Sequence, residues 1–126
     1  MKTIWTYLQG VDFQQRFYDS AGVRTRVIES GSSEKVLIFL HGTGGHAEAY
    51  LKNIATHSEH FRVMAIDMVG HGYTSAPDIS YDMQCYVDFL LDFLDEVGVE
   101  KAYISGESLG ATVAAWFAIA HPNRVE

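Results

Sequence analysis

Residues 102–118 read AYISGESLGATVAAWFA, and this stretch decides the fold of the 126-residue chain. It begins as a short apolar run, passes through two glycines on either side of Ser108 and continues as an apolar segment long enough for a helix. A buried strand that turns directly into a helix is typical of folds in which parallel strands alternate with covering helices.

Gly106–Gly110 reads G-E-S-L-G and matches the G-x-S-x-G pattern, in which a serine occupies a sharp strand-to-helix turn. Such a turn strains the backbone, and glycines two residues to either side remove side chains that would collide there. The first amides of the helix also face an oxygen that becomes negative during a reaction. We therefore predict that Ser108 is a nucleophile supported by Gly106 and Gly110. A plain glycine turn is the alternative, and the flanking strand and helix argue against it.

Strands and helices alternate along the rest of the chain. Alternating or continuous apolar runs predict strands at Phe13–Asp19, Val23–Glu29, Val36–Leu40, Val63–Ile66 and Ala102–Ile104. Apolar positions at helical spacing predict helices around Tyr50–Ala55, at Met83–Val97 with Ser80 as N-cap and Gly98 as stop, and from Ser108 to just before His121-Pro122. The expected fold is an α/β fold with a mostly parallel sheet, an N-terminal antiparallel hairpin and flanking helices.

A second glycine-rich segment, His41–Gly45, follows the apolar strand that ends at Leu40. In the elbow mechanism one oxyanion donor is the amide after the nucleophile and another comes from the loop after the third strand. We therefore predict an oxyanion hole made by the N–H groups of Thr43 and Leu109, with His41, Gly42 and Gly44 supporting the loop. A phosphate-binding loop is the competing interpretation, but the Lys-Ser/Thr ending of such loops is missing here.

A third loop, Asp67–Ser75, follows the strand Val63–Ile66. Its glycines are expected to shape a turn, and Asp67 to accept hydrogen bonds from loop backbone. His71 is interpreted as a structural residue. The tryptophans, Trp5 and Trp116, are interpreted as packing residues.

Composition narrows the class of protein. The 9 basic and 16 acidic residues give a net charge of −7, which disfavours binding to nucleic acid or to an anionic membrane. No apolar stretch is long enough for a membrane span, and Cys85 is the only cysteine. We expect a cytoplasmic protein without cofactor or metal.

The order strand-H-G-x-G-G, D-x-x-G-H-G-x-x-S and G-x-S-x-G resembles the N-terminal half of the α/β-hydrolase family. Two stretches, Gly22–Gly31 and Phe61–Ser75, are similar to the meta-cleavage product hydrolases. That resemblance implies a small-molecule substrate, a 2-hydroxy-6-oxo-dienoate from aromatic ring fission, of which a C–C bond is cleaved. The chain departs from that subfamily at Thr43–His46, at Glu107 and at Gly110-Ala111, so a carboxylesterase or lactonase is an alternative. A non-catalytic ligand-binding homologue is another, and haloperoxidase-like activity also suits a serine triad.

The acid and the base of a triad are not apparent. Hydrolases of this type carry the triad in the order serine, acid, histidine, yet only 18 residues follow Ser108 (126 minus 108). His121 should lie about 20 Å away, at the far end of the helix, because a helix rises about 1.5 Å per residue. We expect residues 1–126 to form the N-terminal part of a single domain that lacks the lid, the C-terminal strands, the acid and the histidine. The chain alone is expected to be inactive, and a complete form is compatible with a homo-oligomer.

Overall fold

The computed structural model describes all 126 residues and contains one five-stranded sheet in the order β1-β2-β4-β3-β5. The strands are β1 (Phe13–Ser20), β2 (Val23–Ser30), β3 (Val36–Leu40), β4 (Arg62–Ile66) and β5 (Tyr103–Gly106). β1 and β2 form an antiparallel hairpin, β2 joins β4 in antiparallel fashion, and β3 pairs in parallel with β4 and β5. The predicted α/β sheet with an N-terminal hairpin is confirmed.

The chain also forms three α-helices and three 3₁₀-helices. They are α1 (Leu51–Ser58), α2 (Met83–Glu96), α3 (Leu109–Ala120), η1 (Ile4–Leu8), η2 (Ala47–Tyr50) and η3 (Pro122–Arg124). The predicted N-cap of α2 was wrong: Asp82, not Ser80, caps the helix, because its carboxylate accepts a hydrogen bond from the Cys85 amide at 2.9 Å. None of the helices combines the length and the apolar character that crossing a membrane would require.

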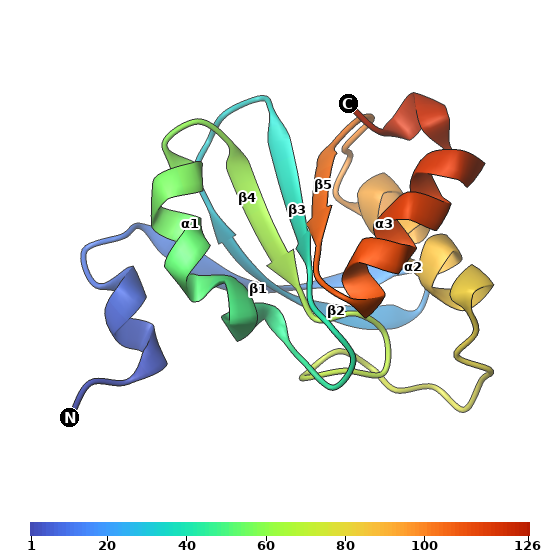
Figure 1. Ribbon diagram of the computed structural model, residues 1–126, viewed down its shortest axis with the longest axis horizontal. Helices are drawn as coiled ribbons and strands as arrows, with labels where there is room; N and C mark the ends of the chain where they lie inside the picture. The colour runs from blue at the N-terminus through green and yellow to red at the C-terminus, as the bar shows by residue number, and fades with distance from the viewer.

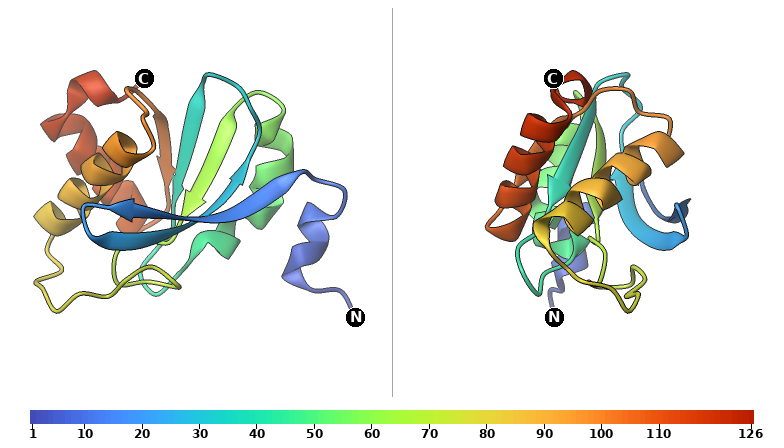
Figure 2. Two further views of the ribbon diagram at one scale, coloured as in Figure 1. Left: turned by 180° about the vertical axis from the view of Figure 1, so that it is seen from behind. Right: turned by 90° about the vertical axis from the view of Figure 1, so that its right-hand side faces the viewer.

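Alternate residues of the central strands feed two separate cores. Val36, Ile38 and Leu40 of β3 contribute to a cluster of 18 buried residues that includes the apolar faces of α2 and α3. Leu37 and Phe39 contribute to a cluster of 9 buried residues together with α1. In Figure 1, α1 lies against β4 while α3 runs alongside β5; Figure 2 shows from behind how α2 lies next to the hairpin.

The first turn of α3 crosses the end of β3 at very short range. A Cβ atom at Gly110 would overlap the carbonyl groups of Leu40 and His41, and one at Gly106 would overlap the Gly110 backbone. Only glycine lets a helix and a strand approach this closely. The two glycines therefore fix the turn that contains Ser108 against the end of β3.

A buried cluster of ion pairs connects the loops at the end of the sheet where β3 and β4 finish. The guanidinium group of Arg26, whose side chain is 1% exposed, binds Glu48 of η2 and Asp67 after β4, and hydrogen-bonds Gln15 of β1. Asp67 also accepts hydrogen bonds from the amides of Ala47 and Tyr73, at 2.7 and 2.8 Å. Residues from both strands of the hairpin, from η2 and from the loop after β4 thus meet at one cation.

Replacing Gly110 with alanine should destabilise the fold by about 1–3 kcal/mol, because the added methyl group must displace backbone carbonyls rather than a flexible side chain. Urea unfolding followed by circular dichroism measures the change. Gly42→Ala is the matched control, since its Cβ would make only an ordinary contact with Ser108 Cβ at 3.4 Å. Equal stabilities for Gly110→Ala and the unmodified protein would contradict the close crossing.

Stability should fall in acid partly through Glu48. Burial alone would raise the pKa of Glu48, but the hydrogen bonds and charge of Arg26 outweigh it and lower this pKa to about 2. A carboxyl group with a depressed folded-state pKa contributes fully above its ordinary value of 4.5, and the contribution is lost as pH falls towards 2. Glu48→Gln should therefore lose less free energy of unfolding between about pH 6 and about pH 3 than the unmodified protein.

Urea titrations at several pH values provide the measurement for Glu48. Glu59→Gln, at an exposed carboxylate outside the ion cluster, is the control and should keep the steep acid dependence of the unmodified protein. If the free energy of unfolding fell by the same amount with pH in Glu48→Gln and in the unmodified protein, Glu48 would not contribute to the acid dependence.

Candidate active site

Ser108 lies in the sharp turn between β5 and α3. Its backbone has φ 51° and ψ −116°, and it is one of only two non-glycine residues with positive φ. Non-glycine residues adopt this strained conformation when the surrounding structure enforces it, and such positions cluster at functional sites. Ser108 is exposed. It follows β5 at the end of the sheet where the strands β3, β4 and β5 finish, which is the lower end in Figure 1.

The loop after β3 stands next to this serine. Gly42 faces it, since a Cβ atom built on Gly42 would lie 3.4 Å from Ser108 Cβ and 3.7 Å from the Glu107 carbonyl oxygen. The amides of Thr43 and Leu109 donate no hydrogen bond to another group of the chain. Leu109 is the first residue of α3, where helical amides have no intrahelical acceptor. The structure thus brings the two sequence-predicted donors to the same corner as Ser108.

His41 fixes the orientation of the Gly42–Thr43 peptide. Its buried ring accepts a hydrogen bond from the Met68 amide at Nε2 (2.9 Å), so Nδ1 carries the proton and donates to the Gly42 carbonyl oxygen at 2.7 Å. The same oxygen accepts from the Gly45 amide at 3.0 Å. Because the carbonyl and amide of a trans peptide point in opposite directions, the Thr43 N–H is held on the side away from His41.

The charge state of His41 suits this supporting role. Burial lowers the pKa of His41, and the neighbouring His71, whose ring centroid lies 4.8 Å away, acts in the same direction. The imidazole is therefore neutral at physiological pH, and both its nitrogens are already used. His41 supports the loop and is unsuited to take a proton from Ser108.

The loop after β4 adopts a structural role, as expected for Asp67 and His71. Asp67 accepts hydrogen bonds from loop amides, and a Cβ atom at Gly72 would overlap its carboxylate. His71 Nδ1 lies 3.1 Å from the Val69 carbonyl oxygen. The partnership of Asp67 with Arg26 is not foreseen from the sequence, where an arginine in an alternating strand is its only indication.

Tyr50 is a further residue near the site that sequence reasoning misses. Its hydroxyl donates to the Leu40 carbonyl oxygen at 2.7 Å, the same oxygen that accepts from the Glu107 amide. Burial raises the pKa of Tyr50, and the negative charge of Glu107 adds to this. Tyr50 thus stays protonated and supports the end of β3 beneath Ser108.

No hydrogen bond joins a histidine of the chain to Ser108. His46 pairs with Glu48, with 2.6 Å between Nδ1 and Oε2, and His57 Nδ1 contacts the Asn53 carbonyl oxygen. His121 caps the far end of α3, which spans 12 residues and therefore about 18 Å. This agrees with the expectation that His121 cannot reach the serine.

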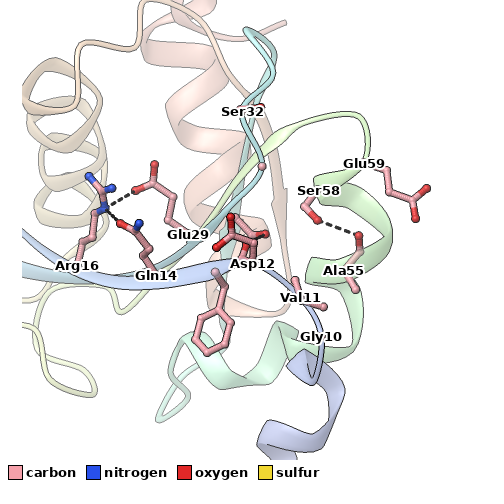
Figure 3. A pocket seen from close by; sticks show the side chains of 13 residues that line it. Gly10, Val11, Asp12, Gln14, Arg16, Glu29, Ser32, Ala55, Ser58 and Glu59 are labelled. Atoms are coloured by element: carbon pink, nitrogen blue, oxygen red, sulfur yellow. Dashed lines mark hydrogen bonds and ion pairs between the residues drawn. The ribbon is translucent and has the colours of Figure 1, made fainter.

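The main cavities lie elsewhere. The largest has a volume of about 510 Å³ and is formed by the start of the hairpin and the end of α1 (Figure 3). It is polar, and one of its carboxylates, Glu29, is paired with Arg16 and Arg62. Ser108, Thr43 and Leu109 line none of the four main cavities. In the 126-residue chain, Ser108 therefore faces an open surface and not a cavity.

Comparison with known proteins identifies relatives for most of the chain. The chain is 34% identical over 110 residues to the dihydrolipoyllysine-residue acetyltransferase component of the acetoin cleaving system of Cupriavidus necator, covering 87% of this chain and 29% of that protein. It is 32% identical over 117 residues to the 2-hydroxy-6-oxo-6-(2'-aminophenyl)hexa-2,4-dienoic acid hydrolase of Metapseudomonas resinovorans, covering 90% and 40%.

A solved structure agrees with these relatives. The naproxen esterase (carboxylesterase NP) of Bacillus subtilis superposes with a TM-score of 0.87 at 29% identity, covering 95% of this chain and 44% of that one. The chain therefore spans less than half the length of the proteins it matches. The sequence model of the alpha/beta hydrolase fold matches residues 35–126, and the chain belongs to this family.

Proposed function

We propose that this chain carries the nucleophile and the oxyanion hole of a serine hydrolase that cleaves a bond next to a carbonyl group. One observation carries the proposal: Ser108 occupies a strained, exposed turn beside Gly42, and the two nearby amides of Thr43 and Leu109 have no acceptor in the chain. A binding protein has no need of a strained serine next to two unused donors.

The reaction follows from this arrangement. Ser108 Oγ adds to the carbonyl carbon while a base takes the hydroxyl proton, and the carbonyl oxygen becomes an oxyanion. The N–H groups of Thr43 and Leu109 stabilise that charge, and removing one such donor typically costs about 10²–10³-fold in rate. When the intermediate collapses, the leaving group departs with the bonding electron pair and receives the proton from the base. Water then hydrolyses the acyl-serine and releases the acid.

The preferred substrate is a 2-hydroxy-6-oxo-dienoate. Support comes from the relative of Metapseudomonas resinovorans, whose name describes such a substrate, and from a 34% identical 2-hydroxymuconate semialdehyde hydrolase of Pseudomonas. In this version the substrate first tautomerises, with the proton of its 2-hydroxyl group moving to C5. The electron pair of the broken C5–C6 bond then passes through C3 and C4 to the C2 oxygen, and the leaving group is a dienolate. The bond broken is then a C–C bond.

A carboxylic ester is the second candidate substrate. A Bacillus subtilis relative named as an uncharacterised carboxylesterase is 34% identical over 105 residues, and the naproxen esterase shares the fold. Glu107, directly before the nucleophile, and the Thr43–His46 loop differ from the pattern of the C–C hydrolases. In this version the leaving group is an alkoxide, and the same two amides hold the oxyanion.

The base and the acid are proposed to come from polypeptide outside residues 1–126. No hydrogen bond joins any of the six histidines to Ser108, and a serine hydroxyl is a weak nucleophile until a base takes its proton. In the matched proteins more than half of the length lies outside the region aligned with this chain. We accordingly propose residues 1–126 as the N-terminal part of one hydrolase domain.

The 126-residue chain by itself should hydrolyse p-nitrophenyl acetate no faster than its Ser108→Ala variant, within about twofold, because its serine has no base. Release of p-nitrophenol provides the measurement. An enzyme-like rate that disappears in Ser108→Ala would show that the chain already contains a base, and the proposed division of the domain would be wrong.

An extended form tests the nucleophile itself. In this form the part of the Bacillus subtilis naproxen esterase that lies outside its matched region is joined after Glu126. Fluorophosphonate labelling and turnover of the extended form should fall at least about 10³-fold in Ser108→Ala, because the covalent step requires the Ser108 hydroxyl. Ser105→Ala, at an exposed serine of β5, is the control and should label normally.

The substrate class is decided by the specificity of the extended form. A higher kcat/KM for 2-hydroxy-6-oxo-6-phenylhexa-2,4-dienoate than for p-nitrophenyl acetate supports the C–C hydrolase, and the reverse order supports the esterase. A correctly folded extended form that reacts with neither substrate and does not label at Ser108 would favour a non-catalytic ligand-binding protein.

A further inference from the structure

The tip of the loop after β3 makes no hydrogen bond of its own. Thr43 and Gly44 are exposed, and none of the hydrogen bonds of the chain involves either residue. Gly44 has a φ of 72°, and a Cβ atom built on it would have no neighbour within 4 Å. The direction of the Thr43 N–H therefore depends on the residues that hold the two ends of the loop.

Both ends of this loop are held by hydrogen bonds. On the β3 side, the His41 ring donates to the Gly42 carbonyl oxygen. On the other side, the Gly45 amide donates to the same oxygen at 3.0 Å, and the chain then passes directly into η2. Thr43 lies inside the turn that this second bond closes. A shift of η2 is therefore transmitted through Gly45 to Thr43.

Glu48 joins η2 to a buried cation whose donors are all occupied. All three guanidinium nitrogens of Arg26 donate hydrogen bonds, and the acceptors belong to Gln15, Glu48 and Asp67. Both carboxylate oxygens of Glu48 accept from this group, which fixes the direction of the carboxylate as well as its distance. Burial alone would raise the pKa of Glu48, but the hydrogen bonds to Arg26 lower it to about 2, so Glu48 is charged at neutral pH.

The same carboxylate holds the last residue of the loop. His46 Nδ1 lies 2.6 Å from Glu48 Oε2, and because Glu48 is charged, this nitrogen carries a proton and donates it. The His46 side chain is 51% exposed, and a contact of such an exposed group contributes little to stability. Its effect is on geometry, because it fixes residue 46 relative to Arg26.

We propose that Glu48 is a positioning residue of the oxyanion hole. It holds η2 and His46 against Arg26, and by this route it keeps the Thr43 N–H directed at the carbonyl oxygen of the substrate. Glu48 acts through the loop and takes no part in the chemical step. This inference rests on the proposed function, since that function makes Thr43 an oxyanion donor.

Gln15 provides the matched control, because it binds the same cation from another element. Its Oε1 atom accepts hydrogen bonds from Arg26 at 3.0 and 2.8 Å, but it belongs to β1 and not to η2. If the cluster of ion pairs only stabilised the fold, Gln15→Ala and Glu48→Gln would affect Thr43 alike. If Glu48 positions the loop, only Glu48→Gln changes Thr43.

Backbone NMR relaxation of the 126-residue chain tests the positioning without any need for catalysis. The Thr43 amide should have an order parameter of about 0.85, the value of rigid backbone, and it should fall below about 0.6 in Glu48→Gln. His46→Ala should lower it in the same direction by a smaller amount, and Gln15→Ala should leave it unchanged. Circular dichroism at neutral pH checks that each variant is folded.

Turnover of the extended form tests the consequence for catalysis. Glu48→Gln should lower kcat for the better substrate at least about tenfold and leave KM within about twofold, because an oxyanion donor acts on the transition state. Thr43→Pro removes the donor itself, since proline has no N–H group. In that background Glu48→Gln should change kcat by less than about twofold, because the group that Glu48 positions is missing.

Any of four results would overturn the proposal. These are a Thr43 amide that is mobile in the unmodified chain, a rigid Thr43 amide in folded Glu48→Gln, an equal loss of order in Gln15→Ala, and a loss of kcat in Glu48→Gln that is the same with and without the Thr43 N–H. An extended form that fails to label with a fluorophosphonate would refute the proposed function. Loosening of Thr43 in Glu48→Gln would still show in that case that Glu48 positions the loop.

Discussion

The whole candidate site depends on one steric constraint, the contact between the first turn of α3 and the end of β3. Gly110 lies so close to the Leu40 and His41 carbonyl groups that no side chain fits between them, and Gly106 meets the same turn from the strand side. This contact determines how far Ser108 is from the loop that begins at His41. The two glycines set the distance between the serine turn and this loop, and the other contacts of the site hold the loops in that arrangement.

Hydrogen bonds from buried groups then fix the loops around that contact. His41 joins the loop after β3 to the loop after β4 through Met68, and Tyr50 binds the Leu40 carbonyl oxygen from below. Arg26 and Asp67 connect the same loops to the hairpin and η2. The exposed turn that contains Ser108 therefore lies above a layer of polar groups that all have hydrogen-bond partners. Such a layer lets a strained serine persist, because the surrounding contacts outweigh its backbone cost.

Periodic patterns in the sequence predict the strands and helices, whereas contacts that depend on a single residue could not be predicted. The apolar runs at Val36–Leu40 and around Leu90 have clear periodicities, and the structure confirms a strand and a helix there. The glycine spacing around Ser108 likewise predicts a strand-to-helix turn. In contrast, the partner of Arg26 could not be predicted, because Asp67 is 41 positions away and no local pattern connects them. The interpretation of Trp116 as a packing residue is wrong for these 126 residues, in which it is 53% exposed, since apolar composition does not say whether a covering element is present.

The parallel pairing of β3 with β5 has a consequence for the order of folding. It joins Leu37 to Tyr103, 66 positions apart (103 minus 37), whereas the hairpin joins residues separated by a few positions at its turn. Closing a long loop costs more chain entropy than closing a short one, so distant pairings form late. During synthesis the hairpin and the β3–β4 pair can form before residue 103 has left the ribosome. The serine turn is therefore assembled after the hairpin and the β3–β4 pair, on a scaffold that already exists.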